Sequence, residues 1–183
     1  GSTYVGGDKN DGINYMISSG NYPNVAAYDS LTMNYGDQFR GEIMLDSLNN
    51  IIVGSCTRSD NFPTKNPFQA TRAGQQDGVV FKLKNDFSDL VFSSFYGWEE
   101  ADATYSVKID SSYNIVFGGG TISPDIPITT GTYQSSYGGG KADGFIGKLS
   151  PDGTILTHST YVGTSNYDQI FFVEIDRNDN IFV

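Results

Sequence analysis

The stretch ADATYSVKIDSSYNIVFGGG at residues 101–120 alternates apolar and polar side chains, turns at small polar residues and ends in a compact apolar run. Tyr105, Val107 and Ile109 fall on one side of the chain if the period is two, as in a β-strand. Asp, Asn and Ser in the turn DSSYN can hydrogen-bond to their own backbone. The stretch therefore predicts a β-hairpin.

The hairpin recurs at a fixed distance along the chain. A second copy, YDQIFFVEIDRNDNIFV, occupies residues 167–183 and aligns at an offset of 66, which pairs Asp110 with Asp176. An earlier copy, GDQFRGEIMLDSLNNIIVGSC, covers residues 36–56 and places Asp46 64 residues before Asp110. A period of this length indicates a repeat protein in which neighbouring units stack.

Each unit continues with two more strand-like runs. These are DGFIGKL (143–149) and TILTHSTYVG (154–163) in one unit, and DGVVFKL (77–83) and SSFYG (93–97) in the preceding one. The sequence SPDG between the first two runs is a strong turn signal. No segment has helical periodicity. Each unit therefore predicts four antiparallel strands.

Four strands are too few for a β-sandwich with its own core, which is the main alternative. Radial stacking of four-stranded sheets is the β-propeller. We therefore expect an all-β fold, a β-propeller fragment of about three four-stranded antiparallel blades, of which the first and last are incomplete. The expected parts are the last strand of a preceding blade (1–7), an insertion loop (12–35), a blade (36–97), a second blade (101–163) and the first half of the next (167–183). Because both ends fall inside a unit, we expect a fragment of a longer chain that supplies the remaining blades.

Three stretches carry a family resemblance: STYVGG at 2–7, VKIDSSYNIVFGGGT at 107–121 and TTGTYQSSYGGGKADGFIGKLSPDGTILTHSTYVG at 129–163. Together they resemble the SBBP repeat, named for a seven-bladed β-propeller, over nearly the whole chain except the insertion. The resemblance implies large bacterial proteins, exported or displayed at the cell surface, with propeller repeats beside adhesion-type modules. It supplies no catalytic residues to carry over.

Composition excludes several classes of function. A net charge of −10 with no basic cluster argues against a nucleic acid partner. No apolar run approaches the roughly 18 residues of a membrane span. The single cysteine, Cys56, allows no disulfide within the chain, and the single histidine, His158, allows no site built on two histidines. His158 aligns with Phe92 of the preceding unit, which favours a packing or edge position. Cys56 aligns with Gly120, which favours a small buried thiol. We predict no catalytic residue, metal or cofactor.

Acidic residues recur in every unit. An Asp-x3-Asn turn could be imagined as a calcium site, but it lacks the Gly and the distal Glu of an EF-hand loop. We therefore expect turn stabilisation by three Asp/Asn pairs: Asp46 with Asn50, Asp110 with Asn114, and Asp176 with Asn180. We expect a similar structural role for the aspartates that precede strands: Asp37, Asp102, Asp168, Asp77 and Asp143.

Residues peculiar to one unit are the better candidates for ligand contact. The first-to-second and third-to-fourth turns are short, whereas the second-to-third loops (57–76 and 121–142) are long, which predicts one elaborated face. The insertion belongs to that face, because 31 residues separate Gly6 from Asp37 but 5 separate Gly97 from Asp102, so 26 are extra. Tyr with small polar residues is typical of recognition loops. The candidates are Tyr15, Tyr22, Tyr28 and Tyr35 in the insertion and Trp98 and Glu99 in the neighbouring inter-blade loop. Alternatively, these aromatic residues only pin a long loop onto the disc, or the insertion forms one more local hairpin.

Two hypotheses of function follow. The first is a non-catalytic β-propeller region of an exported or cell-surface bacterial protein that acts in binding, adhesion or scaffolding, with a protein or glycan as ligand. The second is a fragment of a carbohydrate-active hydrolase or lyase whose catalytic residues lie mostly elsewhere.

Overall fold

The computed structural model describes residues 1–12, 16–17, 25–26, 31 and 41–183, and these contain strands and no helix. The first sheet consists of β3 (Glu42–Leu45), β4 (Ile51–Thr57), β5 (Asp77–Leu83) and β6 (Leu90–Tyr96). The second sheet consists of β7 (Asp102–Ile109), β8 (Ile115–Thr121), β9 (Asp143–Leu149) and β10 (Leu156–Val162). Two short hairpins complete the description, β1 (Met16–Ile17) with β2 (Val25–Ala26), and β11 (Glu174–Ile175) with β12 (Ile181–Phe182).

The two sheets are built alike, which confirms an all-β fold of four-stranded antiparallel units. In both, the strands pair in chain order, and the register repeats: Ile51 lies opposite Leu83 as Ile115 lies opposite Leu149. Neither sheet closes on itself. The period found in the sequence is therefore a period of the fold.

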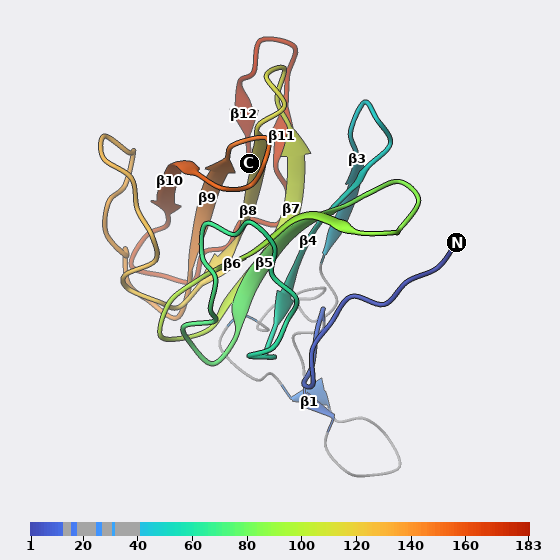
Figure 1. Ribbon diagram of the computed structural model, residues 1–183. Helices are drawn as coiled ribbons and strands as arrows, with labels where there is room; N and C mark the ends of the chain where they lie inside the picture. Colours follow the sequence, from blue (N-terminus) through green and yellow to red (C-terminus); the bar gives the residue numbers. More distant parts are fainter. Residues whose placement is uncertain (13–15, 18–24, 27–30, 32–40) are drawn as a thin grey trace.

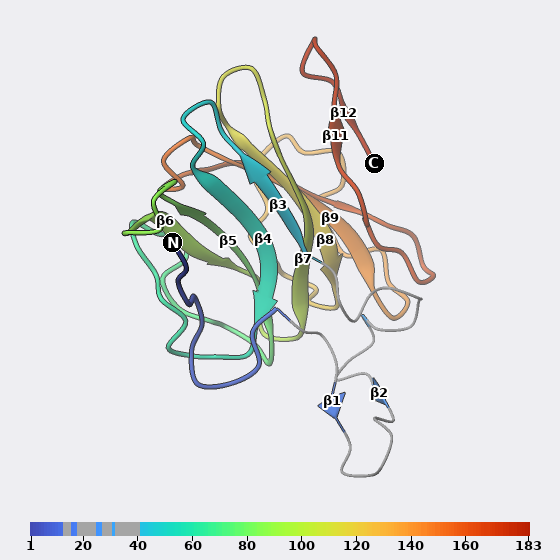
Figure 2. The same cartoon turned by 90° about the vertical axis from the view of Figure 1, so that its right-hand side faces the viewer.

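The core of the molecule lies between the two sheets, which stack face to face (Figure 1, Figure 2). Tyr96 of β6 places its ring edge-to-face on Phe117 of β8, with centroids 4.9 Å apart, and 4.6 Å from Phe145 of β9. Aromatic pairs in this geometry are stabilising beyond the area they bury. Around them the shared cluster includes Ile52, Val80, Phe92, Val107, Ile115, Leu149 and Tyr161.

The hairpin β11–β12 lies on the opposite face of the second sheet, so three layers follow one another in chain order (Figure 2). Ile170 and Val173, just before β11, pack on Val116 of β8 in a separate buried cluster. A side chain at Gly118 of β8 would collide with Val173, since a Cβ there would lie 2.8 Å from its Cγ2. The hairpin therefore sits on the second sheet as the second sheet sits on the first.

Polar contacts join the first strands of successive layers. Glu42 of β3 accepts hydrogen bonds from Ser106 Oγ at 2.6 Å and from the Val107 N–H at 2.8 Å. Ser106 Oγ in turn accepts the N–H of Val173 at 3.0 Å. Lys108 of β7 contacts both Glu42 and Glu174 of β11, the latter at 3.5 Å. The first strands therefore lie side by side along one edge of the stack.

The long second-to-third loops run beside the last strand of their own sheet, an arrangement that the loop lengths do not predict. Lys65 and Ser93 of β6 exchange two backbone hydrogen bonds, of 3.1 and 2.8 Å. In the next unit the N–H of Tyr161 in β10 donates to the Gln134 carbonyl at 3.1 Å. An outer strand left open presents unpaired backbone groups to other chains. These loops cover that edge.

The strand expected at residues 1–7 is not formed, because no described strand offers these residues a partner to pair with. The segment instead lies against the outer face of the first sheet. There Val5 packs on the cluster of Phe62, Val79 and Phe81. Tyr4 stays fully exposed.

Candidate functional site

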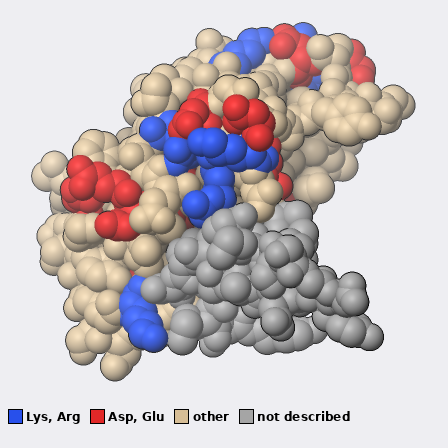
Figure 3. All heavy atoms as spheres, turned by 90° about the horizontal axis from the view of Figure 1, so that it is seen from below, with Lys and Arg blue, Asp and Glu red and all other residues tan. Residues whose placement is uncertain are grey.

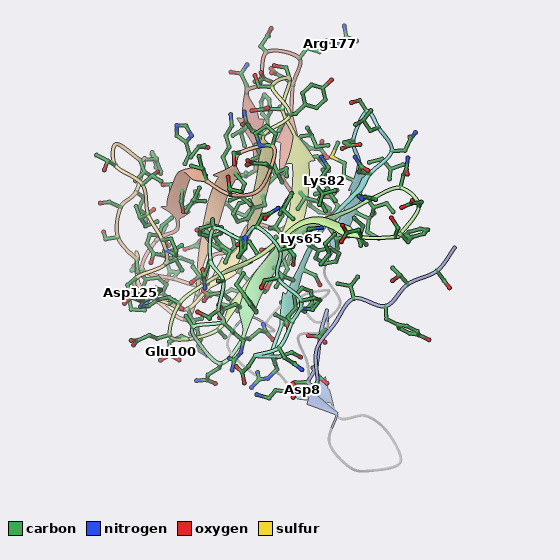
Figure 4. The ribbon with its side chains drawn as sticks, viewed as in Figure 1. Asp8, Lys65, Lys82, Glu100, Asp125 and Arg177 are labelled. Carbon is green, nitrogen blue, oxygen red and sulfur yellow. The ribbon has the colours of Figure 1, made fainter. Side chains whose placement is uncertain are left out.

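The two ends of the sheets differ as the loop lengths predict. Figure 4 shows Arg177, in the β11–β12 turn, at one end and Asp8, Glu100 and Asp125 at the other. We call the second one the loop end; it consists of the segments that leave β4, β6 and β8 and enter β5, β7 and β9. Acidic and basic side chains lie beside one another in the view from below (Figure 3). Asp60 follows this pattern, because it accepts from both Lys9 and Arg72.

The predicted contact residues are only partly described. Tyr15, Tyr22, Tyr28 and Tyr35 lie outside the described residues. Trp98 and Glu99 lie at the loop end, exposed, with 40% of the Trp98 surface accessible. The N–H of Trp98 donates to Asp102 Oδ2 at 2.8 Å, which fixes the backbone beneath the indole.

Leu31 places one point of the insertion. It is fully buried in a cluster with Cys56, Ala103 and Tyr105, next to the start of β7. Its carbonyl accepts the side-chain amide of Gln169 at 3.1 Å. The insertion therefore contacts the loop end of the second sheet, and Cys56 is the small buried thiol that the sequence predicts. Sequence reasoning missed Leu31 because the apolar residues of the insertion follow no regular period that would single one of them out.

An aspartate occupies the same place at the start of each unit. Asp11 accepts the N–H of Gly7 at 2.8 Å, and Asp102 accepts that of Trp98 at the same distance. In both sheets a threonine at the end of the second strand donates its hydroxyl to the other carboxylate oxygen. Asp168 repeats the backbone contact at 2.8 Å, with the N–H four residues before it. Asp11, Asp102 and Asp168 are thus structural counterparts.

The sequence alignment pairs Asp37 with Asp102. Asp37 lies outside the described residues, and Asp11 makes the contacts expected of it. Asp11 follows the first glycine of STYVGG by 5 residues, the spacing that separates Asp102 from the glycine of SSFYG. The first unit therefore starts at Asp11, before residue 36. The insertion interrupts its first strand, which resumes at Glu42.

Two carboxylates meet where the first sheet joins the second. Asp77 starts β5 and Asp102 starts β7, both are fully buried, and Gly97 separates them. A Cβ on Gly97 would lie 2.6 Å from Asp102 Oδ2 and 2.9 Å from Asp77 Cγ, so only glycine fits. Asp77 accepts hydrogen bonds from the Gln69 amide and the Ala73 N–H, each at 3.0 Å.

Burial raises the pKa of both groups, to about 6 for Asp77 and about 7 for Asp102. The negative charge of Asp77 raises the pKa of Asp102 further, while hydrogen bonds from Thr121 and Trp98 oppose the rise. Two close carboxylates titrate as a coupled pair. The pair therefore takes up protons near neutral pH.

A similar pair recurs one unit later. Asp143, at the start of β9, is fully buried, and burial and then the charge of Asp168 raise its pKa. Its Oδ2 accepts the N–H of Gly138, while Oδ1 has no hydrogen-bond partner among the described residues. Gly163 lies against Asp143 as Gly97 lies against Asp77, with a Cβ position 2.4 Å from Asp143 Oδ1. Because the carboxylate pair recurs in successive units, it indicates a structural role in the repeat.

We predict that the chain gains stability as pH falls from 7.5 to about 5. In the unfolded chain these carboxyls have an ordinary pKa of 3.8, so in this window the folded state binds more protons than the unfolded state. The contribution is therefore fully present below pH 3.8 and is lost as pH rises through the folded pKa values of about 6 and 7. Urea unfolding at a series of pH values measures it. The double variant Asp77→Asn, Asp102→Asn flattens the profile; an unchanged profile in that variant contradicts the assignment.

The structure confirms that the aspartates of the Asp-x3-Asn turns stabilise those turns. Oδ1 of Asp110 accepts the N–H groups of Ser112 at 2.9 Å and Asn114 at 2.8 Å, and Oδ2 accepts the Asn114 amide at 2.9 Å. Lys148 of β9 adds an ion pair at 2.6 Å. Tyr113 takes the left-handed conformation that closes the turn, with φ of 65°. These carboxylate oxygens already accept hydrogen bonds, which is the chemistry of a turn and not of a calcium site.

Asp46 repeats the geometry in the first sheet, with Lys82 at 2.6 Å. Although burial opposes its ionisation, hydrogen bonds from Lys82 and Asn50 lower its pKa to about 2. Among the described residues no group of three or more His, Cys, Asp and Glu side chains is placed to hold a metal ion.

His158 lies in β10 with an exposed side chain, and its Nδ1 is 3.3 Å from Thr157 Oγ1. Its counterpart Phe92 is fully buried beneath the second sheet. The position shared by Phe92 and His158 is therefore buried in the first sheet, which the second sheet covers, and exposed in the second sheet.

No family model and no curated protein matches the chain. In the part of the chain that the structure describes, no helix is long and apolar enough to cross a membrane.

Proposed function

We propose that this chain is a repeat region of a β-propeller, similar to the SBBP repeat, that acts in binding, adhesion or scaffolding without catalysis. In this proposal it belongs to a bacterial protein that is exported or displayed at the cell surface. The remaining blades of the same chain complete the propeller, and the loop end contacts a protein or glycan ligand.

One observation carries the proposal: three layers with the same internal contacts follow one another in chain order, joined along their first strands. The contacts among Glu42, Ser106 and Val173 run from layer to layer. Repeated radial stacking of four-stranded sheets with the first strands together is the plan of a propeller. A two-sheet sandwich does not account for a third layer that repeats the second.

The alternative, a fragment of a carbohydrate-active hydrolase or lyase, draws on the raised pKa values of Asp77 and Asp102, because perturbed carboxyls gather at active sites. However, both side chains have no exposed surface, and their oxygens accept hydrogen bonds from their own chain. A similar pair recurs at Asp143 and Asp168. Burial and recurrence support a structural role over substrate contact.

The test is substitution of the exposed aromatic residue of the loop end. We expect Trp98→Ala, combined with Tyr22→Ala and Tyr28→Ala, to weaken binding on a glycan and surface-protein panel by about tenfold or more, because large aromatic residues dominate such contacts. The control is Tyr113→Ala, an exposed aromatic residue of the β7–β8 turn at the opposite end, which is expected to leave binding unchanged. Thermal unfolding checks that each variant stays folded. Release of sugar from a polysaccharide panel, persisting in the triple variant, contradicts the proposal and favours the enzyme.

A further inference from the structure

The hairpin β11–β12 exposes side chains at positions whose counterparts in the four-stranded sheets are buried. Val116 of β8 has no exposed surface, whereas Phe182, its counterpart 66 residues later, is 57% exposed. Ile115 is 1% exposed and its counterpart Ile181 is 41% exposed. In the second sheet these positions are covered by β9 and by the layer stacked on β8. The backbone edge of β12 pairs with β11 on one side only.

A groove of about 390 Å³ lies next to that edge, on the outer half of the second sheet. Its lining is mostly apolar and includes Thr129, Tyr133, Ile146, Lys148, His158 and Ile181. In the first sheet the corresponding place is filled. Phe92, the counterpart of His158, is fully buried, and the β9–β10 turn covers it so closely that a Cβ on Gly153 would lie 2.2 Å from its ring. A turn of the same kind therefore fits over His158.

The lysine–aspartate pairs of the two complete sheets indicate which charge a segment bound in the groove should carry. In each complete sheet a lysine of the third strand pairs with the turn aspartate: Lys82 with Asp46 and Lys148 with Asp110, both at 2.6 Å. Among the described residues no lysine or arginine pairs with Asp176, although its turn has the same hydrogen bonds. By comparison with Lys82 and Lys148, the group that would pair with Asp176 is a cation.

The pairing register of the second and third strands shows where this cation would lie. Lys82 lies opposite Ile52, and Lys148 lies opposite Val116. The counterpart of Val116 is Phe182, so a lysine opposite Phe182 reaches Asp176. Five residues beyond each lysine the chain takes a positive φ, 61° at Phe87 and 75° at Gly153, in the turn that ends the third strand.

We propose that the open edge of β12 and the groove beside His158 bind a β-hairpin of the β9–β10 type. Its first strand has the pattern Asp-Gly-x-x-x-Lys-Leu shared by residues 77–83 and 143–149, and a turn with positive φ follows five residues after the lysine. The strand adds to β12 through main-chain hydrogen bonds, as in other cases of strand addition. The lysine pairs with Asp176, and the turn covers His158. This inference does not depend on the ligand of the loop end.

A synthetic peptide with the sequence of residues 141–163 is the probe, added to the intact chain. His158 is the only histidine, so its ring proton resonances report the groove without labelling the protein, and a peptide with His158→Phe keeps the signal single. We expect saturable binding that shifts these resonances. A Lys148→Glu change in the peptide weakens binding by about tenfold, because close charge pairs couple strongly across interfaces.

Charge exchange makes the test specific. Asp176→Lys in the chain weakens binding of the unchanged peptide, and together with the Lys148→Glu peptide it restores the affinity. Asp176 is only partly buried and lies in a surface turn, so this variant is expected to fold. Ile181→Arg fills the groove and abolishes binding. The proposal is overturned by absence of binding, or by binding that Asp176→Lys leaves unchanged, as when the peptide replaces the chain's own β9–β10. A dimer of the chain that the peptide does not dissociate also overturns it, because a second copy then occupies the groove.

Discussion

Phe117→Ala is expected to lower the free energy of unfolding by about 3–5 kcal/mol, the cost of emptying a large aromatic site in a packed core. Phe117 has no exposed surface and lies where the two sheets meet, against the Tyr96 ring. Gly147, opposite it in β9, leaves the space its ring fills, since a Cβ there would lie 2.2 Å from Phe117 Cζ. Alanine leaves a cavity that both sheets border.

Urea denaturation followed by tryptophan fluorescence and circular dichroism measures this loss. The control is Tyr133→Ala, which removes an aromatic ring that is 87% exposed and is expected to change stability by about 0.5 kcal/mol or less. A loss below about 1 kcal/mol for Phe117→Ala contradicts a core shared by the two sheets.

Asp110→Ala is expected to lower the free energy of unfolding by about 3 kcal/mol, because it leaves the half-buried Lys148 ammonium without its partner. The N–H groups of Ser112 and Asn114 lose their acceptor in the same substitution. Asp110→Asn restores part of the loss, since an amide oxygen accepts from those N–H groups but does not attract the lysine.

Asp176→Ala is the matched control for this prediction. Asp176 accepts the same turn hydrogen bonds from Asn178 and Asn180, but no described lysine pairs with it, and its side chain is less buried than that of Asp110. We therefore expect a much smaller loss. Equal losses in chemical denaturation of the two variants show that the turn alone, and not the ion pair with Lys148, determines the effect.

Ionisation of Asp110 adds a pH dependence of the opposite sign to that of the Asp77 and Asp102 pair. Burial opposes its charge, but hydrogen bonds from Lys148 and Asn114 lower its pKa. The stability from a lowered pKa is present above the ordinary value of 3.8 and is lost as pH falls below it. The two kinds of aspartate together place maximum stability in mildly acidic solution.

The sequence alone predicted the hairpins, the turns and the four-stranded units, because these depend on local patterns that recur. The alternation at Tyr105, Val107 and Ile109 and the turn after Asp110 needed no distant contact to be recognised. Recurrence at 66 residues then separated signal from chance. The burial of Cys56 was predicted for the same reason, since its counterpart is a glycine in a central strand.

Three features could not be read in this way. The role of Asp11 was missed because the insertion separates it from the strand at Glu42, although the 5-residue spacing from STYVGG to Asp11 was visible. The long loops were expected to elaborate one face. That they also form backbone hydrogen bonds with the outer strands β6 and β10 was not predicted, because loop length alone does not show where a loop runs. The contacts of Glu42 with Ser106 and Lys108 join strands 64 to 66 residues apart and have no local signature.

We propose that these sheets are successive layers around a common axis, with β3, β7 and β11 nearest to it. A crystal structure of the longest natural chain that contains this sequence tests it most directly. We expect β3, β7 and β11 to lie side by side, and a four-stranded sheet to be completed on β12 with a lysine that pairs with Asp176. A structure in which the first and second sheets form a closed two-layer sandwich, with residues 167–183 elsewhere, contradicts it.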